Sequence, residues 1–335
     1  MKKFLIKLSC FLAIQIGLCF FFMWYGSRDL NSNEYLYSLK DKYDLLQETT
    51  GPRVIFIGGS NLAFGIHSPL IQQQTGYTPV NMGVHGGLGL ATMLRLVRDQ
   101  IREGDIVVLS PEVAVLVSRP QCGENIAIEA IAAWPGIRPY LQPDFEQSLD
   151  ELAPPRDPMH ELASRVATAL KRLKGRALPE HISYRRDSFN EFGDHVAHYG
   201  LTPERVPKDD YTQVVEAAFM KTAAAMNEFH QFCAARNAAV FYLHPPIRET
   251  NSKNSPEVLD QMDLLLKREI DFPMLTQWRS AILADTMFFD SKFHLNEMGA
   301  KTRSKIICQL LDQDGNAVQA DRQASIDEGL EATRR

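Results

Sequence analysis

The chain has 335 residues, of which 45% are hydrophobic and 23% are charged, and its formal net charge is −5. This composition is that of an ordinary globular protein with one or two domains. Because the chain lacks both a basic balance and a basic run, we exclude the electrostatic pattern of nucleic-acid-binding proteins and expect no nucleic acid as a partner.

The N-terminal segment differs in composition from the rest of the chain. Three lysines among the first seven residues precede an 18-residue apolar run at positions 8–25, which ends in Trp24 and Tyr25. This length is near the minimum for a membrane-spanning helix, and interfacial aromatics often close such helices. No small-residue cleavage site follows, so an anchor is favoured over a cleaved signal peptide. Residues 1–29 are predicted to form a transmembrane helix in the cytoplasmic membrane, with the following domain on the periplasmic or extracytoplasmic side.

Strand and helix patterns alternate after this segment. The expected strands are 53–57, 78–83, 104–112, 238–246 and a short fifth at 272–277, and the expected helices are 33–47 (a stalk or first helix), 67–76, 89–101, 212–237, 255–270 and 296–313. Continuously apolar strands are typical of parallel sheets that are covered on both faces. The alternation therefore predicts an α/β fold with a doubly wound parallel sheet.

Residues 119–210 interrupt the alternation with prolines, charges and short amphipathic runs, one of which predicts a helix at 161–175. We interpret this stretch as a helical insertion, a lid or cap at the substrate site, within one domain at 30–313. The polar residues 314–335 are predicted to form a disordered tail.

A serine follows the first expected strand on a two-glycine turn, in the segment "IGGSN". In an open parallel sheet, ligands bind outside the carboxyl ends of the strands, so the loops after the strands should meet at one edge. We expect the polar side chains of these loops to form the nucleophile and the substrate pocket: Ser60, Asn81, His85, Glu112 and His244.

The segment "FFDSKFHLN" places Asp290 and His294 before the last helix. A carboxylate and an imidazole at this spacing fit into one turn, where the histidine accepts the serine proton and the aspartate fixes its tautomer. The alternative is that Asp290 or Asn296 caps the closing helix and that His294 is an ordinary polar residue.

On these residues the chain resembles the SGNH/GDSL hydrolase superfamily, and more narrowly its membrane-anchored members associated with exopolysaccharide systems. "IGGSN" is similar to the first block of the family, "NMGVHGG" to the second and "DSKFHLN" to the last, and the resemblance covers 53–112 and 238–311. It implies a flavodoxin-like sheet and no cofactor. It also implies that Ser60 is the nucleophile, His294 the base and Asp290 the residue that orients the base.

The resemblance further implies an oxyanion hole. The second block supplies the backbone N–H of Gly83, and the N–H of Ser60 or the amide of Asn61 would complete the set. The asparagine of the third block has no match in "LSPEVAV", where Glu112 stands in the corresponding loop and cannot donate while ionised. Asp290 also stands four residues before the histidine, where the family usually has three.

These patterns predict a serine esterase or O-acyltransferase that acts on acyl esters, with acetyl the expected group, of a cell-surface or secreted polysaccharide. The alternative is a non-catalytic, membrane-anchored scaffold of a polysaccharide biosynthesis or export complex. The expected partners are the polysaccharide or another acyl-ester substrate and the cytoplasmic membrane. A membrane-embedded acyltransferase or export proteins are candidate protein partners.

Two minor patterns remain. His195 and His198 in "GDHVAH" could share one face of a helix and bind a metal, but no third ligand is evident and a solvated polar loop is favoured, so no metal site is predicted. The cysteines beyond the apolar run, Cys122, Cys233 and Cys308, have no paired spacing, and buried thiols are favoured over one disulfide.

Overall fold

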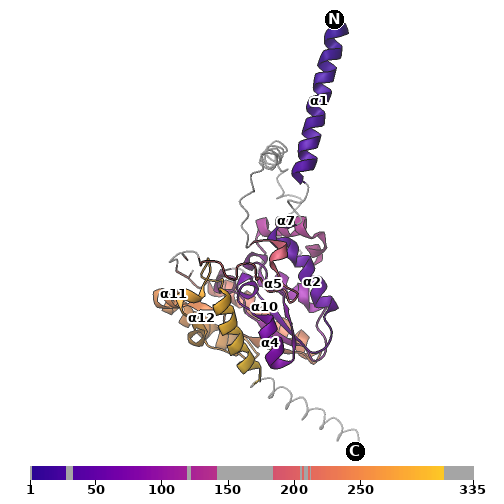
Figure 1. Cartoon of the computed structure of the whole chain (residues 1–335). Helices are drawn as coiled ribbons and strands as arrows, with labels where there is room; N and C mark the ends of the chain where they lie inside the picture. Colours follow the sequence, from indigo (N-terminus) through magenta and orange to yellow (C-terminus); the bar gives the residue numbers. More distant parts are fainter. Residues whose placement is uncertain are drawn as a thin grey trace, which may run out of the picture.

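The computed structural model describes residues 2–27, 33–118, 122–141, 184–203, 206, 210–211 and 213–312 (Figure 1). The helix predicted at 161–175 and the tail predicted at 314–335 lie outside the described residues.

The elements comprise α-helices, short 3-10 helices (η) and strands. In chain order they are α1 (Lys2–Ser27), η1 (Tyr35–Tyr37), α2 (Ser38–Glu48), β1 (Arg53–Ile57), α3 (Ser60–Ala63), α4 (Ser68–Thr75), β2 (Thr78–Asn81), η2 (Gly86–Leu88), α5 (Leu90–Arg98), β3 (Ile106–Leu109), α6 (Val113–Ser118), α7 (Glu124–Ala133), η3 (Pro135–Tyr140), η4 (Arg186–Ser188), α10 (Glu216–Ala234), β4 (Ala239–Tyr242), β5 (Ile247–Arg248), α11 (Glu249–Asn254), α12 (Pro256–Glu269), η5 (Trp278–Ala281), β6 (Ile282–Leu283) and η6 (Asp285–Met287). A last helix covers residues 297–312.

A four-stranded parallel sheet with strand order β2-β1-β3-β4 forms the centre of the fold, which confirms the predicted α/β class and the first four predicted strands. The predicted fifth strand is wrong as a strand. Residues 272–277 make a single parallel bridge, Tyr242 to Met274, and Pro273 has no N–H with which to extend the pairing. Instead β5 and β6 form a separate two-stranded parallel sheet.

Successive residues of each strand pack on opposite faces of the sheet, as the pleat of a strand requires. In β1, Ile55 and Ile57 contribute to a core with α2, α5, α10 and α12. Val54 and Phe56 contribute to a second core with α4 and the helix at 297–312. The sheet is therefore covered on both faces, which is compatible with a doubly wound α/β fold. Figure 1 shows α11 and α12 on one flank of the domain and α2 on the other.

The segment predicted as a stalk or first helix at 33–47 belongs to the domain. It forms η1 and α2, and its residues Leu36, Leu39 and Leu46 are buried in the larger core. This burial favours the first-helix interpretation over the stalk.

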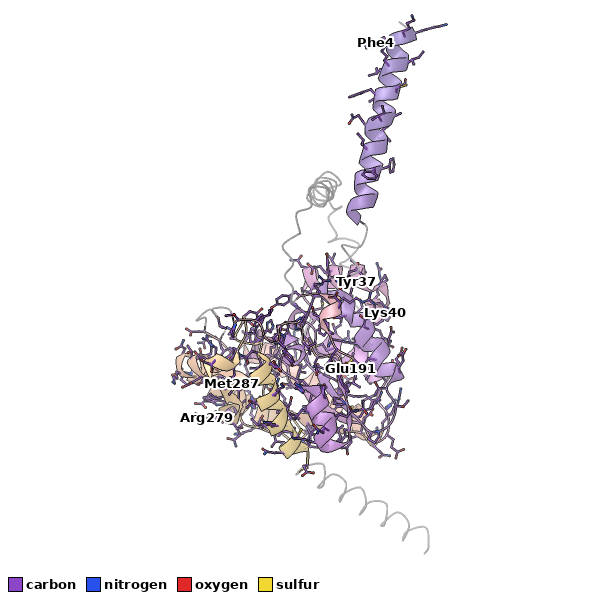
Figure 2. All side chains as sticks on the ribbon, in the orientation of Figure 1. Phe4, Tyr37, Lys40, Glu191, Arg279 and Met287 are labelled. Carbon is purple, nitrogen blue, oxygen red and sulfur yellow. The ribbon has the colours of Figure 1, made fainter. Side chains whose placement is uncertain are left out.

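The N-terminal helix α1 bears exposed apolar side chains, among them Phe4 and Phe20, each 68% exposed (Figure 2). The transmembrane helix predicted at 1–29 is not found. Within the part of the chain that the structure describes, no helix is both long and apolar enough to cross a membrane.

The described part of the predicted insertion lies at the carboxyl edge of the sheet. Asn81, the last residue of β2, donates its N–H to the carbonyl of Phe192 at 2.9 Å, and His195 donates its N–H to the carbonyl of Ala63 at 2.8 Å. The helix α7 packs against η1 and η2. This segment thus borders the edge at which ligands bind in parallel sheets.

A buried ion pair stabilises the opposite end of the sheet. The guanidinium of Arg53, at the start of β1, donates to both carboxylate oxygens of Asp105 at 2.9 and 2.5 Å. It also donates to the carbonyls of Leu46 and Gln100, each at 2.7 Å, and its side chain is fully buried. Four of the five N–H donors of this guanidinium therefore meet an oxygen, and its charge is paired, as a buried charge requires.

Arg53→Met should lower the free energy of unfolding by about 3–5 kcal/mol, because it leaves the carboxylate of Asp105 buried without its partner. Urea unfolding followed by circular dichroism measures the change. Arg268→Met is the matched control. Its guanidinium pairs with Glu216 at the surface and is 57% exposed, so its urea midpoint should match that of the wild type. Equal midpoints for both variants would show that the buried pair contributes nothing to stability.

Candidate active site

The two-glycine turn after β1 is required by the close approach of the loop after β3. A Cβ atom on Gly58 would lie 2.4 Å from the carbonyl oxygen of Ser110, and one on Gly59 would lie 2.5 Å from Oε1 of Glu112. Neither glycine has a positive φ, so the demand is for space rather than for left-handed backbone. The turn delivers Ser60, the first residue of α3, to the edge of the sheet beside Glu112.

The structure brings together the three side chains predicted to form the catalytic triad. Ser60 Oγ lies 2.8 Å from Nε2 of His294, and Nδ1 of His294 lies 2.7 Å from Oδ1 of Asp290. The serine is half-buried, and the side chains of His294 and Asp290 are 10% and 13% exposed. This is the geometry in which a histidine accepts a proton from a serine while a carboxylate fixes the histidine tautomer.

The four-residue spacing between Asp290 and His294 follows from a tight loop. Phe289 donates its N–H to the carbonyl of His294 at 2.9 Å, and Phe288 and Leu295 form an antiparallel bridge. These contacts fold the loop back on itself, so that the carboxylate and the imidazole face each other. The spacing that departs from the family pattern is therefore no obstacle to their contact.

Tyr184, from the predicted insertion, completes the environment of the carboxylate. Its hydroxyl donates to Oδ2 of Asp290 at 2.6 Å and lies 3.1 Å from Nδ1 of His294. Burial alone would raise the pKa of the Asp290 carboxyl. The hydrogen bonds from His294 and Tyr184 and the charge of His294 outweigh burial and hold that pKa below its usual value.

Phe64 packs against one face of the imidazole ring of His294. Its ring stacks on His294 with centroids 4.1 Å apart and an interplanar angle of 11°, and its centroid lies 4.0 Å from that of His195, at an interplanar angle of 17°. Phe64 directly follows α3, four residues after the serine, so one short segment supplies both the nucleophile and the surface on which its base rests. This packing fixes the plane of the histidine.

Glu112 makes direct contact with the nucleophile. Its Oε1 accepts a hydrogen bond from Ser60 Oγ at 2.8 Å and one from the backbone N–H of Asn61 at 3.1 Å. A Cβ atom on Gly86 would lie 2.3 Å from Oε2, so Gly86 borders the other oxygen of the carboxyl. Glu112 is 6% exposed and lies in the loop where the family has its oxyanion asparagine.

Two of the oxyanion donors expected from sequence are engaged elsewhere. Gly83 donates its N–H to Oδ1 of Asn81 at 3.0 Å, and the side-chain amide of Asn61 donates to the carbonyl of Ser110 at 3.0 Å. Two glycines of the second block lie close to the turn that carries the serine: the nitrogen of Gly86 would lie 2.8 Å from a Cβ atom on Gly59, and a Cβ atom on Gly83 would lie 2.7 Å from the carbonyl oxygen of Gly59. Gly86 is the one that also borders the carboxyl of Glu112.

Three residues expected in the substrate pocket belong to other networks. Asn81 is fully buried and donates to the carbonyl of Leu62 and to Asp194. His85 accepts the N–H of Gly87 on its Nδ1 at 2.9 Å and so caps η2. His244 is buried, with Nε2 lying 3.0 Å from a carboxylate oxygen of Asp263. The structure does not bring these side chains to the serine, because each serves a local hydrogen-bond requirement.

The histidine pair of "GDHVAH" lies in a loop rather than on a helix, and both side chains are buried by packing against Phe64, so the predicted solvation of this loop is wrong. Nδ1 of His195 lies 3.0 Å from Nδ1 of His198, and Nε2 of His198 lies 2.9 Å from the carbonyl oxygen of Leu295. Burial is the main reason why the pKa of His198 falls to about 4. Across the described ranges, no group of three or more His, Cys, Asp or Glu side chains could hold a metal ion.

The cysteine thiols beyond the N-terminal segment are free. Cys233 and Cys308 are buried and Cys122 is half-buried, as the sequence favoured. Burial raises the pKa of the Cys122 thiol to about 12. It is therefore not a reactive thiolate at neutral pH.

Comparison of the chain with known protein families gave no match, and neither did comparison with individually curated proteins. The resemblance to SGNH hydrolases therefore rests on the motifs and on the arrangement of the side chains described above.

Sequence reasoning missed Tyr184, Phe64 and Gly86. Tyr184 lies in irregular sequence that carries no signal for its position. Phe64 had a usable signal, because a residue four positions after the serine lies on the same side of a helical turn. Gly86 had a partial one, since the segment "NMGVHGG" offers more than one glycine and the match selected the first.

Tyr184→Phe should raise the pKa of the Asp290 carboxyl, because it removes one of the three hydrogen bonds that favour the ionised form. A carboxyl ¹³C NMR titration measures this pKa directly. Tyr199→Phe is the matched control, because the buried hydroxyl of Tyr199 has no hydrogen-bond partner. If the two variants leave the Asp290 titration equally unchanged, the Tyr184 hydroxyl does not stabilise the carboxylate.

Proposed function

We propose that this protein is a serine-dependent acyl-ester enzyme, an esterase or O-acyltransferase of the SGNH type. The observation that carries the proposal is the continuous contact from Ser60 Oγ through His294 to Asp290, with distances of 2.8 and 2.7 Å. These contacts join residues that are 234 and 4 positions apart in the chain, at the edge of a parallel sheet where catalytic groups of such folds gather.

The chemistry follows from the roles of these groups. His294 takes the proton of Ser60 while Oγ bonds to the acyl carbon of the ester, and the C–O bond to the alcohol then breaks as the same proton passes to the leaving oxygen. Asp290 holds the proton of Nδ1 and stabilises the imidazolium that forms. A water molecule or a sugar hydroxyl then attacks the acyl-serine, which gives hydrolysis or transfer respectively.

We extend the proposal to a flavodoxin-like fold and to a class of substrate. The order β2-β1-β3-β4, with residue 274 bridged beyond β4, supports a flavodoxin-like sheet. The choice of acyl esters on a cell-surface or secreted polysaccharide, with acetyl as the group, rests on the resemblance alone. The half-buried serine at a sheet edge is accessible enough for a substrate that is itself part of a polymer.

A second candidate function is a non-catalytic scaffold of a polysaccharide biosynthesis or export complex. One observation favours it: the N–H of Gly83 and the side-chain amide of Asn61 are bound within the protein rather than free for an oxyanion. Against it stands the intact contact between the serine and the histidine. A scaffold has no need for that contact, whereas an esterase depends on it.

The location and the partners stay predictions from the sequence. The basic N-terminus and the apolar run favour an extracytoplasmic domain at the cytoplasmic membrane. A membrane-embedded acyltransferase or export proteins are the proposed protein partners of that domain. The proposal for the chemistry does not depend on either.

Ser60→Ala should abolish covalent labelling by a fluorophosphonate probe, because the probe bonds to the activated hydroxyl. His294→Ala should slow labelling by orders of magnitude, since the hydroxyl loses its base. Asp290→Asn should also slow it, but by less than His294→Ala. Because the residues act as a unit, Ser60→Ala combined with His294→Ala should hydrolyse p-nitrophenyl acetate no more slowly than Ser60→Ala alone.

Ser280→Ala is the control for labelling, because the hydroxyl of Ser280, a residue of η5, is exposed and donates to the carbonyl of Gln277. It should label at the wild-type rate. If a folded Ser60→Ala variant is still labelled and still hydrolyses the ester, the enzyme proposal fails and the scaffold takes its place.

A further inference from the structure

The hydroxyl of Ser60 lies between two proton acceptors. Its Oγ is 2.8 Å from Nε2 of His294 and 2.8 Å from Oε1 of Glu112. A serine hydroxyl has one hydrogen to donate. Two acceptors at hydrogen-bond distance therefore compete for one proton, unless one of the two carries a proton of its own and becomes a donor.

Counting protons decides which arrangements satisfy every contact. Asp290 accepts from Nδ1–H of His294, so a neutral histidine presents a bare Nε2 to the serine. If Glu112 is then ionised, the serine hydrogen can fill only one of the two contacts, and the other brings two acceptor atoms together without a hydrogen between them. With one more proton in the group both contacts are satisfied, and the proton resides either on Nε2 or on Glu112. In the second case the serine donates to the histidine and Glu112 donates to the serine.

The hydrogen-bond partners of the carboxyl in the described structure include no cation. They are the hydroxyl of Ser60 and the N–H of Asn61, and the backbone of Gly86 borders the other oxygen. Among the titratable groups nearby are His294, Asp290, Tyr184 and Tyr35. The pKa of Tyr35 lies well above its usual value because of burial first, and then because of Tyr184, Glu112 and Asp290. The basic groups on this side are His294, His85 beside Gly86, and Arg303, whose guanidinium donates to the carbonyl of Asn61 and to Oγ of Ser110 rather than to Glu112.

We propose that Glu112 is a catalytic residue that acts in its protonated form, as the hydrogen-bond donor that replaces the missing asparagine at the oxyanion. This inference rests on the proposed function and deepens it. In the resting enzyme the Glu112 O–H donates to Ser60 Oγ. When Oγ bonds to the acyl carbon, the serine proton moves to Nε2 of His294 and the electron pair of the C=O bond moves to oxygen. The Glu112 O–H then donates to that oxygen, which is two bonds from Oγ, and keeps its proton throughout.

The proposal gives the reaction a dependence on pH with a definite sign. The active form holds one proton more than the form with neutral His294 and ionised Glu112. Loss of that extra proton at alkaline pH therefore abolishes activity. Activity is also lost at acid pH, where His294 and Glu112 are both protonated and the base is absent.

The test compares Glu112→Gln with Glu112→Ala, using hydrolysis of p-nitrophenyl acetate across the pH range. Glutamine donates through its amide at every pH, so its rate should no longer fall on the alkaline side. Alanine has no donor, so its rate should drop by about 10²–10³ at every pH. Glu228→Gln is the control, because the Glu228 side chain is 69% exposed and lies on α10, and it should keep the wild-type profile.

Three results would overturn the proposal. The first is an alkaline loss of activity in Glu112→Gln that equals that of the wild type. The second is an equal slowing of the reaction by the alanine and the glutamine variants. The third is a Glu112→Ala variant that is faster than the wild type, which would show that the carboxyl merely blocks the serine. In each of these cases fluorophosphonate labelling that requires Ser60 still supports the esterase. Loss of that requirement, by contrast, refutes the proposed function itself.

Discussion

A buried arginine on the last helix holds together the loops on which the candidate site is built. Arg303, 5% exposed, donates to the carbonyl of Asn61 after β1 at 3.1 Å, to Oγ of Ser110 after β3 at 2.8 Å and to the carbonyl of His244 after β4 at 3.3 Å. All three partners are neutral, and burial lowers the pKa of Arg303 to about 9. Because the same helix follows His294, one guanidinium ties the base to the strand ends that carry the nucleophile and Glu112.

The sequence predicted the sheet well because its strands are buried on both faces. Continuous apolar runs such as 53–57 and the core of 104–112 have few alternatives to a central parallel strand. The segments beyond the last strand of the sheet were harder to predict. Residues 272–277 have the apolar content of a strand, but Pro273 limits them to one bridge, while the two-residue strands β5 and β6 are too short to leave a pattern. The N-terminal run was interpreted from its length, its apolarity, the lysines before it and the aromatic residues that close it, without reference to packing against the domain.

The residues of the candidate site also differ in how well the sequence predicted them. Ser60, His294 and Asp290 were predictable because each stands at a recognisable boundary between a strand or helix and a loop. The contacts that tune them were harder to predict, because they are made across the chain. Tyr184, which was not predicted, reaches Asp290 over 106 positions, and Glu112, which was predicted only as a pocket residue, contacts Ser60 over 52. Conversely Asn81 and His244 stand at strand ends but turn inward, since a buried amide or imidazole must first satisfy its own hydrogen bonds.

The packing that places the serine beside His294 also supplies the second acceptor. Gly58 and Gly59 allow the loop after β3 to approach so closely that Ser110 and Glu112 touch the nucleophile turn. The serine cannot be held in this position without the Glu112 carboxyl beside it, and Arg303 leaves the loops little freedom to separate. Geometry alone therefore does not decide whether the hydroxyl is directed to the base or away from it. A single proton on Glu112 makes that choice, so the identity of one residue in the third block determines whether this arrangement of loops supports catalysis or only the fold.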